Sequence, residues 1–234
     1  SINPYTINGL EPSFGYDFYV RANCGGGDLS EFSTKATAAT ACALVSTMPF
    51  TEDFDGYPGV TSNTVDALPY CWSKLNTGTT YPGLPNIYAS ATYAASGSNS
   101  LHFYTYTTSA YADQTAVLPQ IDITTYPISS LQLTMDVRAN STSYPFVLVV
   151  GIMTDPTDAT TFAVIDTLVW QTTAYTTFEI PLSHYTGTGS YIAVKALKPT
   201  SGYNYGYVDN VVVDLLPSKR RSEERFSRNA ETDL

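Results

Sequence analysis

Two acidic stretches lie far apart in this sequence, and both contain the residue types that bind a divalent cation. Residues 49–57 carry Glu52, Asp53 and Asp55 between aromatic side chains, and residues 207–214 form a second acidic element near the end of the chain. Calcium takes six to eight oxygen ligands from carboxylates, backbone carbonyls and water. If these stretches are the first and last strands of a β-sandwich, they can hold a calcium ion between them.

Period-2 alternation in the first stretch would place Phe54 on one face of a strand and Asp53 and Asp55 on the other. Two interpretations remain open for these carboxylates. They are calcium ligands, or they are strand residues that simply face solvent.

Tyrosines suggest a second kind of chemistry, which is the binding of carbohydrate. Sugars are bound by flat aromatic rings together with polar groups that contact the hydroxyls. An extended segment over residues 201–207 would place three tyrosines on one side, and a second cluster lies earlier in the chain. These residues are Tyr203, Tyr205 and Tyr207, and then Tyr104, Tyr106 and Tyr111. The alternative is that tyrosine-rich edges are ordinary in exported β-proteins.

Residue patterns typical of catalysis are scarce. The histidines are His102 and His184, and no Ser-His-Asp spacing, zinc signature or phosphate-binding loop occurs. Acidic residues near strand ends are too common to indicate a glycosidase pair. The sequence therefore predicts a protein that is not an enzyme.

Composition indicates an exported β-protein. Tyr, Thr and Ser are abundant, only 14% of the 234 residues are charged, and the net charge is -10. Residues 218–234 carry five basic and four acidic groups, which leaves residues 1–217 with six basic and seventeen acidic groups, a net charge of -11. That balance argues against nucleic acid or an anionic membrane as a partner and favours cations. No membrane insertion is expected either, because no transmembrane run is present. Because the chain starts at Ser, without a signal peptide or transmembrane run, we expect a piece of a longer protein.

The three cysteines are Cys24, Cys42 and Cys71, and none belongs to a C-x-x-C pair, so a zinc site is not expected. We predict a disulfide between Cys42 and Cys71, with Cys24 and Cys42 as the competing pair. Either pairing leaves one cysteine over, which is free or pairs outside this piece.

Alternating segments separated by turn residues predict an all-β protein, an antiparallel sandwich or jelly roll. No amphipathic helical run of useful length and no internal repeat is present. The expected strands cover residues 5–7, 16–22, 30–34, 100–104, 131–137, 146–153, 162–170, 177–182, 190–196 and 207–215.

The N-terminal residues 1–38 resemble the last three strands of a fibronectin type III domain. Residues 10–16 are similar to its tyrosine corner, in which a tyrosine hydroxyl is hydrogen-bonded to the chain just upstream. We therefore expect a truncated remnant of such a domain, followed by a linker over residues 39–48, a main domain over residues 49–217 and a disordered tail over residues 218–234.

The main domain resembles the choice-of-anchor J and cleaved-adhesin domains of Bacteroidota surface proteins, which are MAM-like jelly rolls. The resemblance is carried by residues 44–55, 68–72, 96–101, 116–123 and 206–211. It implies a non-catalytic extracellular adhesin or carbohydrate-binding-like module of a secreted or cell-surface protein. The expected partner is a glycan or a host or extracellular protein, and the module is a monomer within a multidomain chain. The alternative is a structural spacer beside a peptidase or glycoside hydrolase.

The same resemblance implies a structural calcium between the first strand, a glycine-containing turn and the last strand. On this sequence the ligands would be Asp55 and Asp209 by side chain, with Asp53 and Asn99 contributing by side chain or carbonyl. Glu52 is a reserve candidate.

Overall fold

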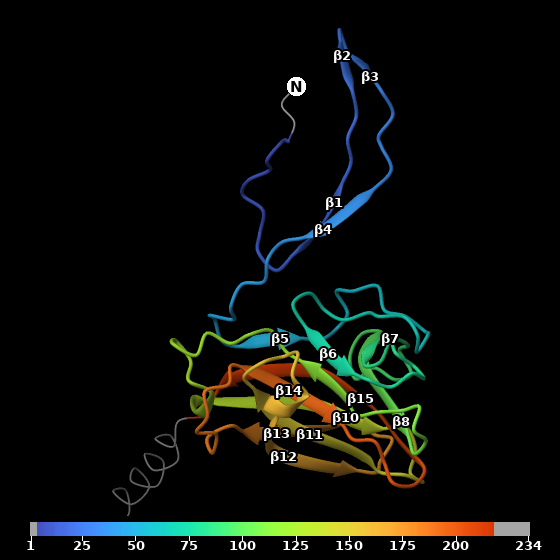
Figure 1. Cartoon of the computed structure of the whole chain (residues 1–234), viewed down its shortest axis with the longest axis vertical. Helices are drawn as coiled ribbons and strands as arrows, with labels where there is room; N and C mark the ends of the chain where they lie inside the picture. Colours follow the sequence, from blue (N-terminus) through green and yellow to red (C-terminus); the bar gives the residue numbers. More distant parts are fainter. Residues whose placement is uncertain (1–3, 218–234) are drawn as a thin grey trace, which may run out of the picture.

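The computed structural model describes residues 4–217, and its body is a sandwich of two antiparallel sheets. Figure 1 shows the two sheets packed over one another. Within the described residues the only helical turns are two short 3₁₀ segments, Ile128–Ser130 and Ala159–Thr161. No helix in residues 4–217 is long and apolar enough to cross a membrane.

The first sheet has the order β13, β10, β15, β8, β7, and β5 also pairs with β15. Its strands are β13 (Thr176–Pro181), β10 (Leu131–Ala139), β15 (Tyr203–Leu215), β8 (Asn99–Tyr106), β7 (Asn86–Ala89) and β5 (Phe50–Glu52).

The second sheet has the order β12, β11, β14, β9, β6. Its strands are β12 (Ala163–Trp170), β11 (Phe146–Met153), β14 (Tyr191–Ala196), β9 (Gln114–Val117) and β6 (Ser73–Asn76).

The core forms between the two sheets because alternate residues of each strand point inward. On β10 every second residue, from Leu131 through Met135 to Ala139, is buried, and the residues between them are half-buried. On β11 nearly every residue is buried. The architecture is an antiparallel jelly-roll β-sandwich, as the alternation predicted.

Most strands of the body lie where the sequence predicted them, and three short ones were missed. The missed strands β6, β7 and β9 have four residues each, too few to show clear alternation. The last strand begins at Tyr203 rather than Tyr207, so it includes the whole tyrosine-rich stretch.

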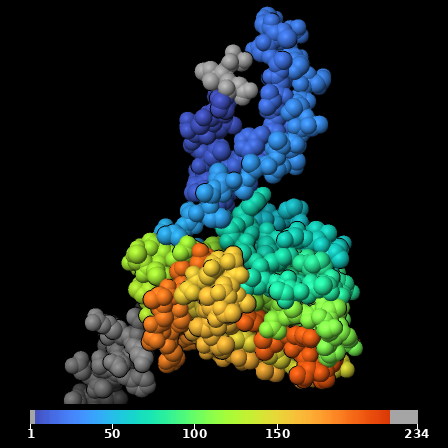
Figure 2. Space-filling model, in the orientation of Figure 1, coloured from blue at the N-terminus to red at the C-terminus, as the bar shows by residue number. Residues whose placement is uncertain are grey.

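Residues 4–41 form an arm that projects from the body (Figure 1), and Figure 2 shows it clear of the body over most of its length. In the arm β1 (Gly15–Phe18) pairs with β4 (Ala36–Ala39), and β2 (Asn23–Gly25) pairs with β3 (Asp28–Leu29). The strands predicted at residues 5–7 and 30–34 are wrong, because neither segment is a strand. Residues 30–34 nevertheless lie against the preceding chain, since the N–H groups of Ser30 and Ser33 donate to the carbonyls of Ala22 and Val20. The arm instead contains β4, which lies at the boundary between the expected remnant and the linker expected from residue 39.

A hydrogen bond in the arm has the geometry expected of a tyrosine corner. The Glu11 backbone N–H donates to the hydroxyl of Tyr16 at 2.7 Å. On β1, the Asp17 carboxylate bonds both Lys35 and Thr37, which fixes the pairing with β4.

A disulfide joins Cys42 to Cys71, whose Cα atoms are 5.6 Å apart, at the point where the arm meets the body. The competing pairing is not formed, and Cys24 is a free, exposed cysteine. The tail predicted as disordered, residues 218–234, lies outside the described residues.

Candidate functional site

The outer face of the first sheet carries the aromatic residues noted in the sequence. On β8, Leu101 and Phe103 point into the core and are fully buried, so His102 and Tyr104 point outward. The antiparallel register places Tyr104 opposite Tyr205 and His102 opposite Tyr207. The outer face of β8 and β15 is therefore a ladder of aromatic pairs.

Seven tyrosines make one continuous patch on this face, which we name the tyrosine surface. Adjacent ring centroids are 4.7–6.1 Å apart. Tyr203 and Tyr144 are each 39% exposed, and the others are half-buried. Burial raises the pKa of Tyr104 to about 12, so its hydroxyl stays protonated and can donate or accept. The members are Tyr81, Tyr104, Tyr106, Tyr111, Tyr144, Tyr203 and Tyr205.

A hollow of ≈ 290 Å³ lies at the edge of the tyrosine surface. Tyr144 and Tyr203 form part of its wall, together with Pro145, Lys198 and Asn204. Aromatic rings next to a lysine amine can stack on a sugar ring and bind its hydroxyls, whereas the Asn204 amide is already hydrogen-bonded to Val147 and Leu197.

Tyr207, the third tyrosine predicted to bind a ligand, has a fully buried side chain, so a ligand could contact it only if the residues that cover it moved. Tyr93 stacks on it with ring centroids 4.7 Å apart and planes 10° apart, and His102 stacks on it at 5.1 Å. Tyr93 belongs to residues 90–98, which we name the covering loop. Of the three predicted tyrosines, Tyr203 is exposed and Tyr205 is half-buried.

Beneath the covering loop lies a group of polar and aromatic side chains, the covered cluster: His102, Arg138, Tyr175, Tyr205 and Tyr207. Arg138 lies on β10 directly opposite Tyr207. Its Nη1 donates to the carbonyl of Thr92 at 2.8 Å, and the Tyr175 hydroxyl donates to the carbonyl of Tyr93. The cluster thus holds the covering loop by its backbone.

The acidic residues predicted as calcium ligands gather at the other end of the covering loop. Asp55 Oδ1 accepts the backbone N–H groups of Ser98 and Asn99, at 2.8 and 3.0 Å. Asp209 Oδ2 accepts the N–H groups of Ala95 and Ser96, at 2.7 and 3.2 Å. Two carboxylates that are far apart in the sequence of the body therefore hold one turn.

Asn99 and Asp53 take part in different contacts. Asn99 Nδ2 donates to the carbonyls of Phe54 and Tyr57, whereas Asp53 Oδ1 accepts the N–H of Asp55 at 3.1 Å. Phe54 is buried while Asp53 and Asp55 are exposed, as predicted. The cause is a turn rather than a strand, since β5 ends at Glu52 and Phe54 has a φ of 62°.

Asp209 is fully buried at a β-bulge, where β15 contains one more residue than β10 and Asn210 has a φ of 48°. Burial raises the pKa of Asp209 to about 6, although three backbone N–H groups oppose the shift. Burial also raises the pKa of Glu52, which accepts the N–H of Phe54. Within residues 4–217 no three acidic, histidine or cysteine side chains converge as a metal site would require.

His102 cannot act as an acid or base near neutral pH. It is 1% exposed, and its burial lowers its pKa to about 3. His184 is exposed on the loop after β13.

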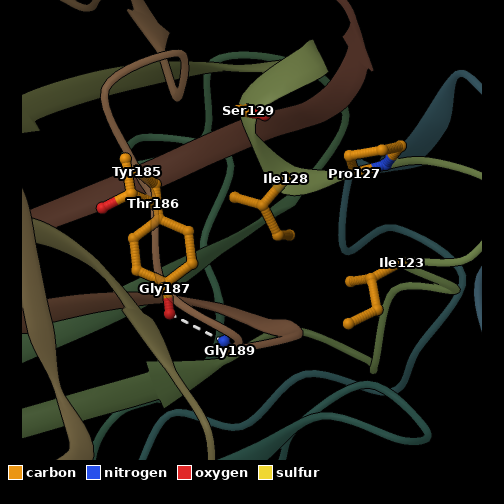
Figure 3. Close-up of a pocket in the computed structure, with 8 residues that line it drawn as sticks. All are labelled: Ile123, Pro127, Ile128, Ser129, Tyr185, Thr186, Gly187 and Gly189. Atoms are coloured by element: carbon orange, nitrogen blue, oxygen red, sulfur yellow. Dashed lines mark hydrogen bonds between the residues drawn. The ribbon is translucent and has the colours of Figure 1, made fainter.

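A hollow of ≈ 220 Å³ lies on another part of the body, and Figure 3 shows the residues that line it. Ile123, Pro127 and Ile128 face the ring of Tyr185, whose hydroxyl accepts the N–H of Gly189 at 2.7 Å. The lining carries no charged group and only a few hydroxyls.

Neither a family model nor a curated protein sequence matches this chain. Among solved structures, the K2 cleaved adhesin domain of Lys-gingipain is similar with a TM-score of 0.53 and 13% identity, over 71% of this chain and 99% of that chain. The K3 cleaved adhesin domain of Lys-gingipain from Porphyromonas gingivalis W83 has a TM-score of 0.46 and 18% identity, over 70% and 96%. A family 30 carbohydrate-binding module of a Clostridium thermocellum cellulase has a TM-score of 0.46 and 13% identity, over 66% and 97%. The likeness to K2 shows a shared jelly-roll fold.

Proposed function

We propose that the main domain, residues 49–217, is a non-catalytic glycan-binding module and that its ligand binds on the tyrosine surface. The observation that carries this proposal is the continuity of that surface. Seven tyrosines from two neighbouring strands and the nearby loops contact one another on the outer face of one sheet.

Physical chemistry supports a sugar as the ligand. Tyrosine combines an apolar face, which packs against sugar C–H groups, with a hydroxyl that bonds sugar hydroxyls. A contiguous aromatic patch left partly open to water marks a binding surface more often than a spacer. A structural spacer remains the alternative, and a protein ligand would use the same rings.

A glycan array with the purified chain tests the proposal, followed by titration calorimetry of each glycan that binds. Tyr203→Ala should weaken binding by roughly tenfold to a hundredfold, since loss of one stacked ring costs on the order of 1–3 kcal/mol. Tyr5→Ala is the matched control, because Tyr5 is 80% exposed and lies in the arm. Absence of any bound glycan, or equal affinity of Tyr203→Ala and the wild type, contradicts the proposal.

The proposal also places the protein outside the cell. The K2 domain, whose fold this chain shares, is by name an adhesin domain. The Cys42–Cys71 disulfide suits an oxidising compartment. We place the module in a secreted or cell-surface protein of several domains.

A structural calcium is the second part of the proposal. The donors fit in part, because Asp55, Asn99 and Asp209 meet at the turn of residues 95–99 and Asp53 lies beside them. Calcium needs six to eight oxygens, so carbonyls and water would supply the rest. A cation at this turn would offset the energetic cost of burying the charged Asp209 carboxylate. By binding both Asp55, which follows β5, and Asp209 on β15, the cation would also connect these two strands.

The arm is proposed to be the C-terminal part of a fibronectin type III domain. The Tyr16 hydroxyl bond supports this assignment, as do exposed apolar residues for which a missing sheet would provide cover. Phe14 is 55%, Val20 70% and Phe32 59% exposed.

A further inference from the structure

Two buried polar groups of the covered cluster have no hydrogen-bond partner. In the described part of the chain, both ring nitrogens of His102 and the Nε of Arg138 are buried and unpaired. His102 is 1% exposed. Both residues point outward from the sheet on either side of Tyr207, so their free hydrogen-bonding atoms share one face. Buried polar groups are nearly always paired, and an exception needs an explanation.

Arg138 also has no carboxylate partner. The ion pairs formed by residues 4–217 are Lys35–Asp17 and Lys74–Asp66, and neither includes Arg138. Its guanidinium instead lies over the rings of Tyr93, Tyr175 and Tyr207, at 5.2–5.8 Å. An arginine fixed by aromatic rings and lacking a carboxylate is suited to bind the carboxylate of a ligand by two parallel hydrogen bonds.

The covering loop occupies this site much as a ligand would. The ring of Tyr93 lies parallel to Tyr207, and the carbonyls of Thr92 and Tyr93 accept hydrogen bonds from Arg138 and Tyr175. Most other residues of the loop are small and exposed. Its second half is fastened separately, by Asp55 and Asp209. The first half can therefore lift while the turn at residues 95–99 stays in place.

We propose that the covering loop is a lid and that the covered cluster binds an acidic sugar. Arg138 would pair with the sugar carboxylate, Tyr207 would stack on the ring in place of Tyr93, and Tyr175 and His102 would bond its hydroxyls. Tyr205 belongs to both the covered cluster and the tyrosine surface, with its ring 5.0 Å from Tyr104 and 5.6 Å from Tyr207. The inference rests on the proposed glycan-binding function and names uronic or sialic acids as the ligand class.

The experiment compares acidic oligosaccharides, including trigalacturonate and sialyllactose, with their carboxyl-reduced neutral forms by titration calorimetry. The wild type should prefer the acidic forms. Arg138→Gln should lose that preference, on the order of tenfold to a hundredfold, so that it binds the acidic forms no more tightly than the neutral forms. Tyr93→Ala should bind the acidic forms roughly tenfold more tightly, because it removes the ring that competes for Tyr207. Thermal melts confirm that each variant is folded.

The outcomes separate this inference from the proposed function. Equal binding of acidic and neutral forms, with full sensitivity to Tyr203→Ala, overturns the acidic-sugar inference and leaves the tyrosine surface as the glycan site. Binding by Tyr93→Ala that is no tighter than the wild type overturns the lid. If neither the wild type nor Tyr93→Ala binds any glycan, the inference and the proposed function are overturned together.

Discussion

Replacing His102 by Phe should reduce the loss of folding stability that this protein undergoes when the pH falls from 8 to 5. Burial lowers the pKa of His102 to about 3 in the native state, against 6.5 for an ordinary histidine. The unfolded chain therefore binds more protons between these values, so stability is complete above pH 6.5 and falls as the pH drops toward 3. At pH 5 native His102 is still neutral, whereas the unfolded histidine is almost fully charged. The cost relative to pH 8 is about 2 kcal/mol.

Urea unfolding at pH 8 and pH 5 measures this cost. Between pH 8 and pH 5 the wild type should lose about 2 kcal/mol more of its free energy of unfolding than His102→Phe does. The raised pKa of Asp209, about 6, acts in the opposite direction, but it does so in both proteins and cancels in the difference.

His184→Phe is the matched control, because His184 is exposed and its loss should leave the pH dependence unchanged. If His102→Phe and the wild type lose the same free energy between pH 8 and pH 5, the imidazole is not kept neutral by burial. At pH 8 the variant should also be at least as stable, since it removes two unpaired buried nitrogens.

Replacing Cys42 and Cys71 by Ser should cost roughly 3–4 kcal/mol in urea unfolding, because the bridge spans 29 residues; a loss below about 1 kcal/mol would contradict this. With calcium present at a concentration well above its Kd, addition of EDTA should lower the melting temperature by roughly 5–10 °C, and Asp209→Ala should abolish that response. Equal responses of the wild type and Asp209→Ala would refute the calcium site. Deleting residues 1–38 should move the melting temperature by less than about 2 °C, because the arm projects from the body. A drop of several degrees would show that the arm is part of the folded body.

The sequence predicted those parts of the fold that depend on local alternation. In β10 polar and apolar residues alternate over nine residues; the strand begins at residue 131 as predicted and extends two residues beyond the predicted end at residue 137. Segments that need a partner behaved differently. Residues 5–7 have strand-forming side chains but nothing to pair with, and Ala36–Ala39 has no alternation yet pairs with β1.

The candidate site was predictable in part for the same reason. Alternation correctly placed Tyr203, Tyr205 and Tyr207 on one face, because that depends on a single strand. It could not show that Tyr93, more than a hundred residues earlier, covers Tyr207. Nor could it show the bulge that buries Asp209, because a bulge is a property of two strands together. His102 was recognised only as a mid-strand histidine, and its unpaired nitrogens become evident only in three dimensions.

The Cys42–Cys71 bridge gives this molecule an unequal response to mechanical force. Tension that enters through the arm reaches Cys42 and passes through the sulfur atoms to Cys71, so the intervening chain carries none of it. That chain includes β5, which therefore cannot be peeled from β15 by a pull on the arm. A reduced molecule would gain roughly 100 Å of extensible chain over the same residues. Oxidation thus sets how far the module can stretch before the sandwich itself bears the load.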